Sequence, residues 1–373
     1  MTEIRTFGDF ATFKYGKMPI KKKITDIGKY PVYSGYRYVG YYDEYNTEAN
    51  QLIVVARGVG GTGDVKLTKE RCFLTNLSIS ASIDETIALP EYIYYRFLLR
   101  NLRYLDSGSA QSQITISDLE KVKIPLPTVN EQRAICGFLS LIDKKIEINK
   151  KINENLEQQA ASCFYHQFIV NTSPSWRAGT ISDLGTVVGG GTPSKAKAEY
   201  YTDNGIAWIT PKDLSTDKSK FIAHGTNDIT ELGLRNSSAT IMPAGTVLFS
   251  SRAPIGYIAI ADGEVSTNQG FKSIIPFNNV GTAFVYFFLK NALPTIENMA
   301  SGSTFKEISG SAMGIVPALI PDNDSLHEFS IFCEPLFKQQ RMLEAENRSL
   351  AALRDALLPH LMSGELDVSN LNI

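Results

Sequence analysis

The stretches TFGDFATFKYGKMP (residues 6–19) and TISDLGTVVGGGTP (residues 180–193) align without a gap. Identical residues pair in register: Thr6 with Thr180, Asp9 with Asp183, Thr12 with Thr186, Gly16 with Gly190, and Pro19 with Pro193. The correspondence continues in chain order, from Arg57 with Arg252 and Thr75-Asn76 with Thr267-Asn268 to Ser107-Gly-Ser109 with Ser301-Gly-Ser303. This self-similarity predicts one duplicated unit of about 190 residues, and hence two similar domains rather than a solenoid.

Length and composition are those of a folded, multidomain chain. The chain has 373 residues, of which 43% are hydrophobic and 20% charged, and its formal net charge is –2. No stretch approaches 18 uncharged apolar residues, and the N-terminus lacks a basic-then-apolar signal, so we expect a cytoplasmic protein that does not enter a membrane. The four cysteines are dispersed, without a C-x-x-C pair, and are expected to be reduced.

Short alternating segments such as Leu52–Ala56 and Ser78–Ile83, followed by a helical segment at Glu91–Leu102, indicate an α+β domain dominated by strands. The second half repeats this order, with a strand at Val247–Ser251 and a helix at Ala283–Asn291. We therefore predict four parts: a globular domain at 1–129, a long helix at 130–168, a second globular domain at 169–326, and a second long helix with a C-terminal tail at 327–373.

Each half ends in a long segment whose apolar residues fall at three- and four-residue steps, as in the narrow seam of a coiled coil. We expect Asn130 to cap the first segment and Pro335 to precede the apolar run of the second. The order domain–helix–domain–helix predicts two antiparallel helices related by a pseudo-twofold axis. Two ordinary amphipathic helices, each packed on its own domain, are the alternative. The seam residues are Ile135, Leu139, Ile142, Ile146, Asn149, Leu156, Leu343, Leu350 and Leu357.

Motifs for chemistry are scarce. The glycine-rich run Gly58–Gly63 matches G-x-G-x-x-G, but the residues after it alternate like a strand, whereas a dinucleotide site requires a helix there. A glycine turn between two strands is the better interpretation. The sequence holds no Walker A, H-E-x-x-H or G-x-S-x-G motif, and its four histidines are scattered. We therefore expect no catalysis, no metal site and no cofactor in this chain.

Features that suit DNA binding are more frequent. Residues 1–129 are mildly basic, with 17 Lys and Arg against 14 Asp and Glu. Polar and cationic side chains recur at matched loops of both halves, where they can donate to phosphates and base edges. For any single one of these side chains, the alternative is that it lies on an ordinary solvated surface and contacts no DNA. The candidates are Lys21, Lys22, Lys23, Arg57, Asn76, Ser109, Gln111, Gln113, Thr192, Ser194, Lys195, Arg252, Asn268, Gln269, Ser303, Thr304 and Lys306.

The motifs resemble a known family. Two domains that begin T-x-x-D-x-x-x-x-x-x-G-x-x-P and close on a long helix are similar to the specificity subunits of type I restriction-modification systems. NEQRAI (130–135) resembles that family's first conserved helix, and LRDALLP (353–359) with LMSGEL (361–366) resembles its C-terminal signature. The second helix departs from the first: it has His327-Glu328-Phe329 where the first has Asn130-Glu131-Gln132.

The resemblance implies that each domain reads one half of a bipartite double-stranded DNA target. It implies that the helices set the spacer and dock two modification (methyltransferase) subunits, and that restriction and translocase subunits complete the assembly. S-adenosylmethionine, ATP and Mg would belong to those partners. Two other hypotheses remain: a non-catalytic two-domain protein-binding scaffold, and a nucleotide-dependent enzyme built on Gly58–Gly63.

Overall fold

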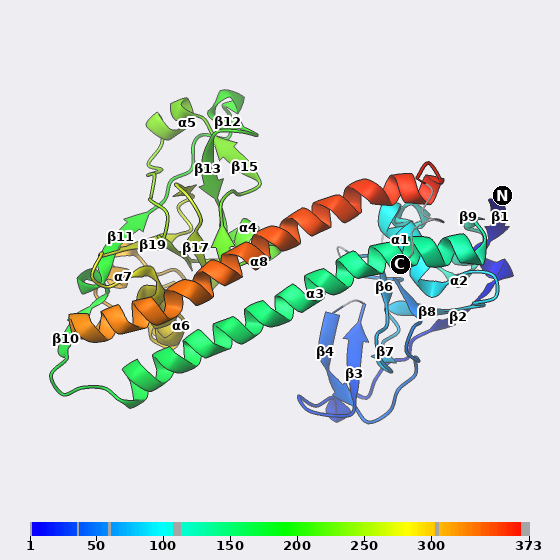
Figure 1. The fold of residues 1–373 in the computed structure, drawn as a ribbon, viewed down its shortest axis with the longest axis horizontal. Helices are drawn as coiled ribbons and strands as arrows, with labels where there is room; N and C mark the ends of the chain where they lie inside the picture. Colours follow the sequence, from blue (N-terminus) through cyan, green and yellow to red (C-terminus); the bar gives the residue numbers. More distant parts are fainter. Residues whose placement is uncertain (1, 36, 59–60, 107–112, 303–305, 367–373) are drawn as a thin grey trace. The chain divides into compact units, whose positions relative to one another are not determined.

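The computed structural model describes residues 2–35, 37–58, 61–106, 113–302 and 306–366 (Figure 1). The chain divides into two compact units: unit 1 comprises Met1–Ile146 with Ser349–Ile373, and unit 2 comprises Glu147–Arg348. The long helices α3 (Val129–Tyr165) and α8 (Asn323–Ser363) each contribute one end to unit 1 and the other to unit 2. Among the described helices, none combines the length and apolar composition that crossing a bilayer requires.

Unit 1 is built on a four-stranded antiparallel sheet with the order β2-β8-β5-β6, a three-stranded sheet β4-β3-β7, and the pair β1–β9. Its strands are β1 (Glu3–Thr6), β2 (Ala11–Tyr15), β3 (Tyr30–Ser34), β4 (Arg37–Tyr42), β5 (Leu52–Val55), β6 (Val65–Leu67), β7 (Phe73–Leu74), β8 (Ser78–Ile83) and β9 (Lys123–Leu126). Its short helices are η1 (Phe7–Asp9), η2 (Lys21–Lys23), α1 (Pro90–Leu99), η3 (Leu102–Leu105) and α2 (Ile116–Glu120).

Unit 2 has a five-stranded sheet with the order β11-β19-β16-β17-β14, a four-stranded sheet β12-β15-β13-β18, and the pair β10–β20. Its strands are β10 (Arg177–Thr180), β11 (Gly185–Gly189), β12 (Tyr201–Thr202), β13 (Ile206–Ile209), β14 (Phe221–Ile222), β15 (Asn227–Ile229), β16 (Val247–Ser251), β17 (Ile255–Ala261), β18 (Ser266–Thr267), β19 (Lys272–Pro276) and β20 (Pro317–Ile320). Its shorter helices are η4 (His166–Val170), η5 (Ile181–Asp183), η6 (Ala198–Tyr200), α4 (Pro211–Thr216), α5 (Glu231–Arg235), α6 (Thr282–Met299) and α7 (Gly310–Gly314).

The two units share a common set of elements, as the sequence predicted, and unit 2 adds further strands and short helices. The pair β1–β9 corresponds to β10–β20, and the neighbours β2–β8 correspond to β11–β19. The parallel pair β3–β7 corresponds to β13–β18, and α1 corresponds to α6. The α+β class and the internal repeat are therefore confirmed. The domain limits 1–129, 130–168, 169–326 and 327–373 stay a prediction.

The residues shared by the two repeats perform the same local task in each. The backbone N–H of Thr6 donates to Asp9 Oδ2 at 2.8 Å, and that of Thr180 donates to Asp183 Oδ2 at 2.8 Å. Each pair forms a capping box on the short helix that follows, η1 or η5. The repeated T-x-x-D is thus a helix start.

The shared glycine is required by close packing. A Cβ on Gly16 would overlap the carbonyl oxygen of Thr75, and a Cβ on Gly190 would overlap that of Asn268. These two oxygens belong to the matched Thr-Asn pairs of the two repeats. Because only glycine leaves room for another backbone at this distance, the position tolerates no side chain.

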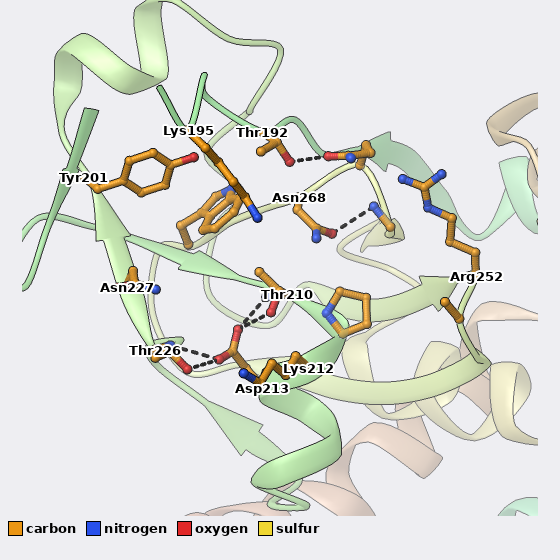
Figure 2. A pocket seen from close by; sticks show the side chains of 15 residues that line it. Thr192, Lys195, Tyr201, Thr210, Lys212, Asp213, Thr226, Asn227, Arg252 and Asn268 are labelled. Carbon is orange, nitrogen blue, oxygen red and sulfur yellow. Dashed lines mark hydrogen bonds between the residues drawn. The ribbon is translucent and has the colours of Figure 1, made fainter. Parts of the chain in front are cut away.

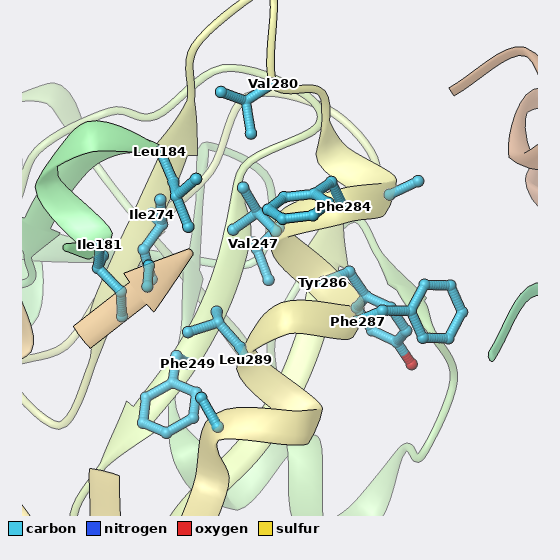
Figure 3. Packing of buried hydrophobic residues seen from close by; sticks show 14 of the residues in the cluster. Ile181, Leu184, Val247, Phe249, Ile274, Val280, Phe284, Tyr286, Phe287 and Leu289 are labelled. Carbon is cyan, nitrogen blue, oxygen red and sulfur yellow. The ribbon is translucent and has the colours of Figure 1, made fainter. Parts of the chain in front are cut away.

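The core of each unit includes residues from both long helices. In unit 1, Leu139 of α3 and Leu361 of α8 are buried in the same cluster as Phe7. In unit 2, the rings of Phe164 of α3 and Phe329 of α8 pack edge to face, with their centroids 5.9 Å apart. Figure 3 shows the adjacent packing of α6, where Phe284 and Leu289 face Val247 and Ile274 of the sheet.

Within each unit α3 and α8 run antiparallel, because rising residue numbers on one helix meet falling numbers on the other. In unit 1 Leu139 clusters with Leu361, and Asp143 pairs with Arg354 at 2.8 Å. In unit 2 Asn149 donates to Asn347 at 3.0 Å, whereas Phe164 packs on Phe329. Of the predicted seam residues, Ile135, Leu139, Ile142, Asn149 and Leu156 are buried, and Ile146, Leu343, Leu350 and Leu357 are half-buried.

The predicted helix starts were wrong in detail. Thr128, not Asn130, caps α3: its hydroxyl accepts from the N–H of Glu131 at 3.3 Å, and Glu131 accepts from the Thr128 N–H at 2.7 Å. Asn130 instead accepts from Arg133 at 3.1 Å. Helix α8 begins at Asn323, before the predicted residue 327, so Pro335 lies inside it.

A polar network anchors the sheet of unit 2 to both helices. The ammonium of buried Lys220 forms an ion pair with Glu157 of α3 and donates to Gln340 Oε1 of α8 at 2.7 Å. Lys290 of α6 also donates to Glu157, at 2.6 Å. Burial opposes ionisation of Glu157, but the two lysines hold the pKa of its carboxyl below the usual value. Lys220 therefore joins three elements that are far apart in sequence.

Lys220→Ala should lower the free energy of unfolding of unit 2 by about 2–3 kcal/mol, because it leaves Glu157 half-buried with one cation fewer. Lys290→Ala is the matched control: it removes the other, more exposed cation from the same carboxylate and should cost about 1 kcal/mol or less. Urea unfolding of both variants measures the difference. Equal losses would contradict a central role of Lys220.

Candidate nucleic-acid interface

Unit 2 contains a cavity of about 670 Å³ at the ends of β13, β16 and β18 (Figure 2). Five of the predicted binding residues line it together: Thr192, Lys195, Arg252, Asn268 and Gln269. The other lining residues are Tyr201, Trp208, Thr210, Pro211, Lys212, Asp213, Thr226, Asn227, Ala253 and Gly270. Residues far apart in sequence thus converge on one polar surface: Thr192 and Gln269, which form a hydrogen bond, are 77 positions apart.

Backbone contacts fix the walls of this cavity. The indole N–H of Trp208 donates to the carbonyl of Gly191 at 2.9 Å, and the Tyr201 hydroxyl donates to that of Pro193 at 2.7 Å. Both carbonyls belong to the glycine-rich turn that follows β11. On the opposite side, Asn268 Oδ1 accepts from the N–H of Gly270 at 2.8 Å and closes the turn before β19.

The one carboxylate on the described lining, Asp213, is fully engaged at the start of α4. Its Oδ2 accepts from the N–H and hydroxyl of Thr210 at 2.8 and 2.6 Å, and its Oδ1 from those of Thr226 at 2.9 and 2.5 Å. Burial alone would raise the pKa of Asp213, but these hydrogen bonds hold it below the ordinary value. Asp213 is therefore a structural anion that ties α4 to the strand β15.

The surface of the cavity is cationic. Lys195 and Lys212 are exposed, and Arg252 is half-exposed at the end of β16. Arg252 Nη1 lies 3.3 Å from Glu307 Oε2, and the backbones of these two residues also form a β-bridge. Three cations thus stand against two carboxylates, the internally bonded Asp213 and the Arg252 partner Glu307, which leaves the exposed Lys195 and Lys212 available to a polyanion.

Unit 1 has a cavity of about 470 Å³ at the corresponding place, at the end of β5. Arg57, the repeat partner of Arg252, lines it together with Arg37. Arg57 forms a backbone bridge with Gln113, as Arg252 does with Glu307. The predicted arginine match is therefore a match in space as well as in sequence.

Other predicted residues lie elsewhere. Lys21, Lys22 and Lys23 form the exposed short helix η2 and do not line the described cavity of unit 1. Asn76 is half-buried and precedes Leu77, which does line that cavity. Ser194 and Lys306 are exposed beside the cavity residues of unit 2. Ser109, Gln111, Ser303 and Thr304 lie outside the described residues.

Sequence reasoning missed Tyr201, Trp208 and Lys212. Tyr201 lies in β12 and Lys212 in α4, two elements outside the matched set, and Trp208 lies in β13, whose counterpart β3 (Tyr30–Ser34) has no tryptophan. The available signal was a tryptophan followed closely by Thr-Pro-Lys, Trp208 to Lys212. The glycine run at 58–63 was assigned correctly: β6, a strand paired with β5, follows it.

Comparison with known proteins decides the family. The model of the type I restriction modification DNA specificity domain matches the chain twice, over residues 2–158 and 175–341. The chain belongs to this family. The two matches coincide with the two repeats, so the family's specificity domain is the duplicated unit found in the sequence.

Individual members of this DNA specificity family show the same relationship. The MjaIX specificity subunit of Methanocaldococcus jannaschii is 38% identical over 178 residues, which cover 45% of this chain and 41% of that protein. The HindI specificity subunit of Haemophilus influenzae is 23% identical over 75% of this chain and 78% of its own. The S subunit from M. genitalium, 22% identical, superposes with a TM-score of 0.63 over 97% of this chain and 96% of its own, and shows the same fold.

The Asp213 hydrogen bonds predict a pH-dependent contribution to stability. Because folding lowers the pKa of Asp213, wild type should exceed Asp213→Asn in unfolding free energy by about 1–3 kcal/mol at pH 7. This advantage is complete above the ordinary value of 3.8 and shrinks as the pH falls from there toward the lowered native value. Chemical unfolding of both proteins between pH 7 and pH 3 measures it. An advantage that is constant across this range would refute the assignment.

Proposed function

We propose that this chain is the DNA sequence-specificity subunit of a type I restriction-modification complex, and that each unit reads one half of a bipartite target. The observation that carries the proposal is the duplicated cavity: Arg57 and Arg252 occupy equivalent places in two repeats of the DNA specificity domain. Two equivalent polar sites suit a target with two specified halves. The relatives MjaIX and HindI are themselves named specificity subunits of type I restriction enzymes.

The long helices suit the docking of partner subunits. Apolar side chains that the cores leave exposed lie along them, Leu141 and Ile148 on α3 and Met342 and Leu353 on α8. In unit 2 a shallow groove of about 520 Å³ includes Met342, Leu343 and Pro335 of α8. We assign these helix faces to two methyltransferase subunits, with restriction and translocase subunits joining the assembly, in the cytoplasm.

Neither alternative has comparable support. A general protein-binding scaffold gives no reason for two equivalent cationic cavities in a DNA specificity family. A nucleotide-dependent enzyme on Gly58–Gly63 would need a helix after the glycines, where the chain forms β6. In the proposed complex, S-adenosylmethionine, ATP and Mg belong to the partner subunits.

The isolated chain should bind DNA weakly, because its net charge is –2 and its cations are confined to local surfaces. Addition of the methyltransferase subunit of the same system should produce sequence-selective binding. A gel-shift titration at physiological salt, with target and scrambled duplexes, compares the two. Tight selective binding by the chain alone would refute the dependence on a partner, and no selective binding with the partner would refute the function.

The helices should also determine the spacer between the half-sites. Paired insertions of four residues, one after Ile152 in α3 and one after Ala345 in α8, keep Gln340 and Glu344 together against Lys220 and lengthen both helices by about 6 Å. The unspecified spacer should then grow by roughly two base pairs while both half-sites stay the same. Sequencing of modified bases in cells that express the complex reads the spacer directly. An unchanged spacer would contradict this role.

A further inference from the structure

Around Arg252 the charged and amide side chains of the unit 2 cavity (Lys195, Lys212, Asp213, Asn268 and Gln269) offer mainly hydrogen-bond donors, whereas the amide of Asn227 elsewhere on the lining can also accept. Asp213 already accepts four hydrogen bonds from Thr210 and Thr226. The amide oxygen of Asn268 accepts from Gly270, and that of Gln269 from the Thr192 hydroxyl. The amide nitrogens of Asn268 and Gln269 have no partner among the described residues and remain free to donate.

The cations add to this donor set. Lys195 and Lys212 make no ion pair within the described part of the chain, and Figure 2 places Lys195 over the cavity beside Asn268, with Arg252 at the far side. Lysine carries a point charge on a flexible stem, which suits phosphate groups. Arginine carries a rigid planar fork of donors, which suits two acceptors at once.

Arg252 differs from the two lysines in being held in place. Its guanidinium contacts Glu307 through Nη1 at 3.3 Å, while its own backbone pairs with that of Glu307. The Glu307 carboxylate is half-exposed and also lies 3.9 Å from the ammonium of Lys272. An arginine tethered on one edge loses little side-chain freedom on binding, and its remaining N–H groups keep a defined direction.

Among the base edges of the major groove, guanine alone presents two acceptors, N7 and O6, without an amino donor. Adenine and cytosine each present an amino group, which would oppose the free donors of Arg252, Asn268 and Gln269. On the basis of the proposed function, we infer that Arg252 reads a guanine in the half-site bound by unit 2. Glu307 is its positioning residue, and Lys195 and Lys212 bind flanking phosphates.

The experiment maps modified bases in cells that co-express the full chain with the methyltransferase subunit of its own system. Arg252→Ala should make one guanine position of one half-site degenerate, with discrimination at that position reduced between about fivefold and a hundredfold. Arg252→Lys, which keeps the charge but loses the fork, should relax the same position. Glu307→Gln, which introduces the residue type of Gln113 in the first repeat, should relax it to a smaller degree.

Two matched variants serve as controls. Arg235→Ala removes an exposed arginine that is paired with Glu231 at 2.9 Å on α5, outside the cavity lining, and should leave the motif unchanged. Arg57→Ala removes the equivalent arginine of unit 1 and should affect the other half-site only. Thermal melting of each variant verifies that it is folded.

The outcomes separate the inference from the function on which it depends. A bipartite motif in wild type whose methylation falls uniformly in Arg252→Ala, with no degenerate position, would assign Arg252 to a phosphate and overturn the inference alone. A degenerate position other than guanine, or one shared with Arg57→Ala, would overturn it as well. No bipartite motif from the wild-type complex would overturn the proposed function and the inference together.

Discussion

The structure depends on two helices that each complete the core of both units. Leu139 of α3 is buried with Leu358 and Leu361 of α8 in unit 1, and Phe164 of α3 with Phe329 of α8 in unit 2. Neither unit therefore has a closed hydrophobic core without a segment of each helix. The buried Asn149, whose amide nitrogen donates to Asn347 and Glu346, fixes the register of the pair in unit 2, because a shifted register would leave that nitrogen without an acceptor.

Much of this organisation could be predicted from the sequence, because a residue that recurs at the same position of both repeats indicates the same local structure in each. The match of Thr6 and Asp9 with Thr180 and Asp183 predicts the two equivalent capping boxes, and the apolar steps predict the buried face of α3, whereas the predicted seam of α8 is only half-buried. The helix starts were less predictable. Thr128 and Asn130 are both good caps, and the reciprocal bond to Glu131, which decides between them, depends on geometry within the first turn.

The candidate site was predictable where the repeats agree and obscure where they differ. Arg252 and Asn268 have identical partners in Arg57 and Asn76, whereas Trp208 of β13 and Lys212 of α4 have no identical partner in the first half. The same difference makes the two cavities unequal in lining, although they share an arginine at the end of a central strand. One scaffold thus keeps its frame constant and varies the chemistry that it presents to a nucleic acid.

The division of the chain between the units also has a consequence for biosynthesis. Unit 2 is one continuous segment, Glu147–Arg348, whereas unit 1 combines Met1–Ile146 with residues that follow unit 2. While the polypeptide is still emerging from the ribosome, its first domain lacks Leu358, Leu361 and Met362, which cover its core. Unit 1 therefore keeps part of its apolar core exposed until the end of α8 has been synthesised, and its core is completed after that of unit 2.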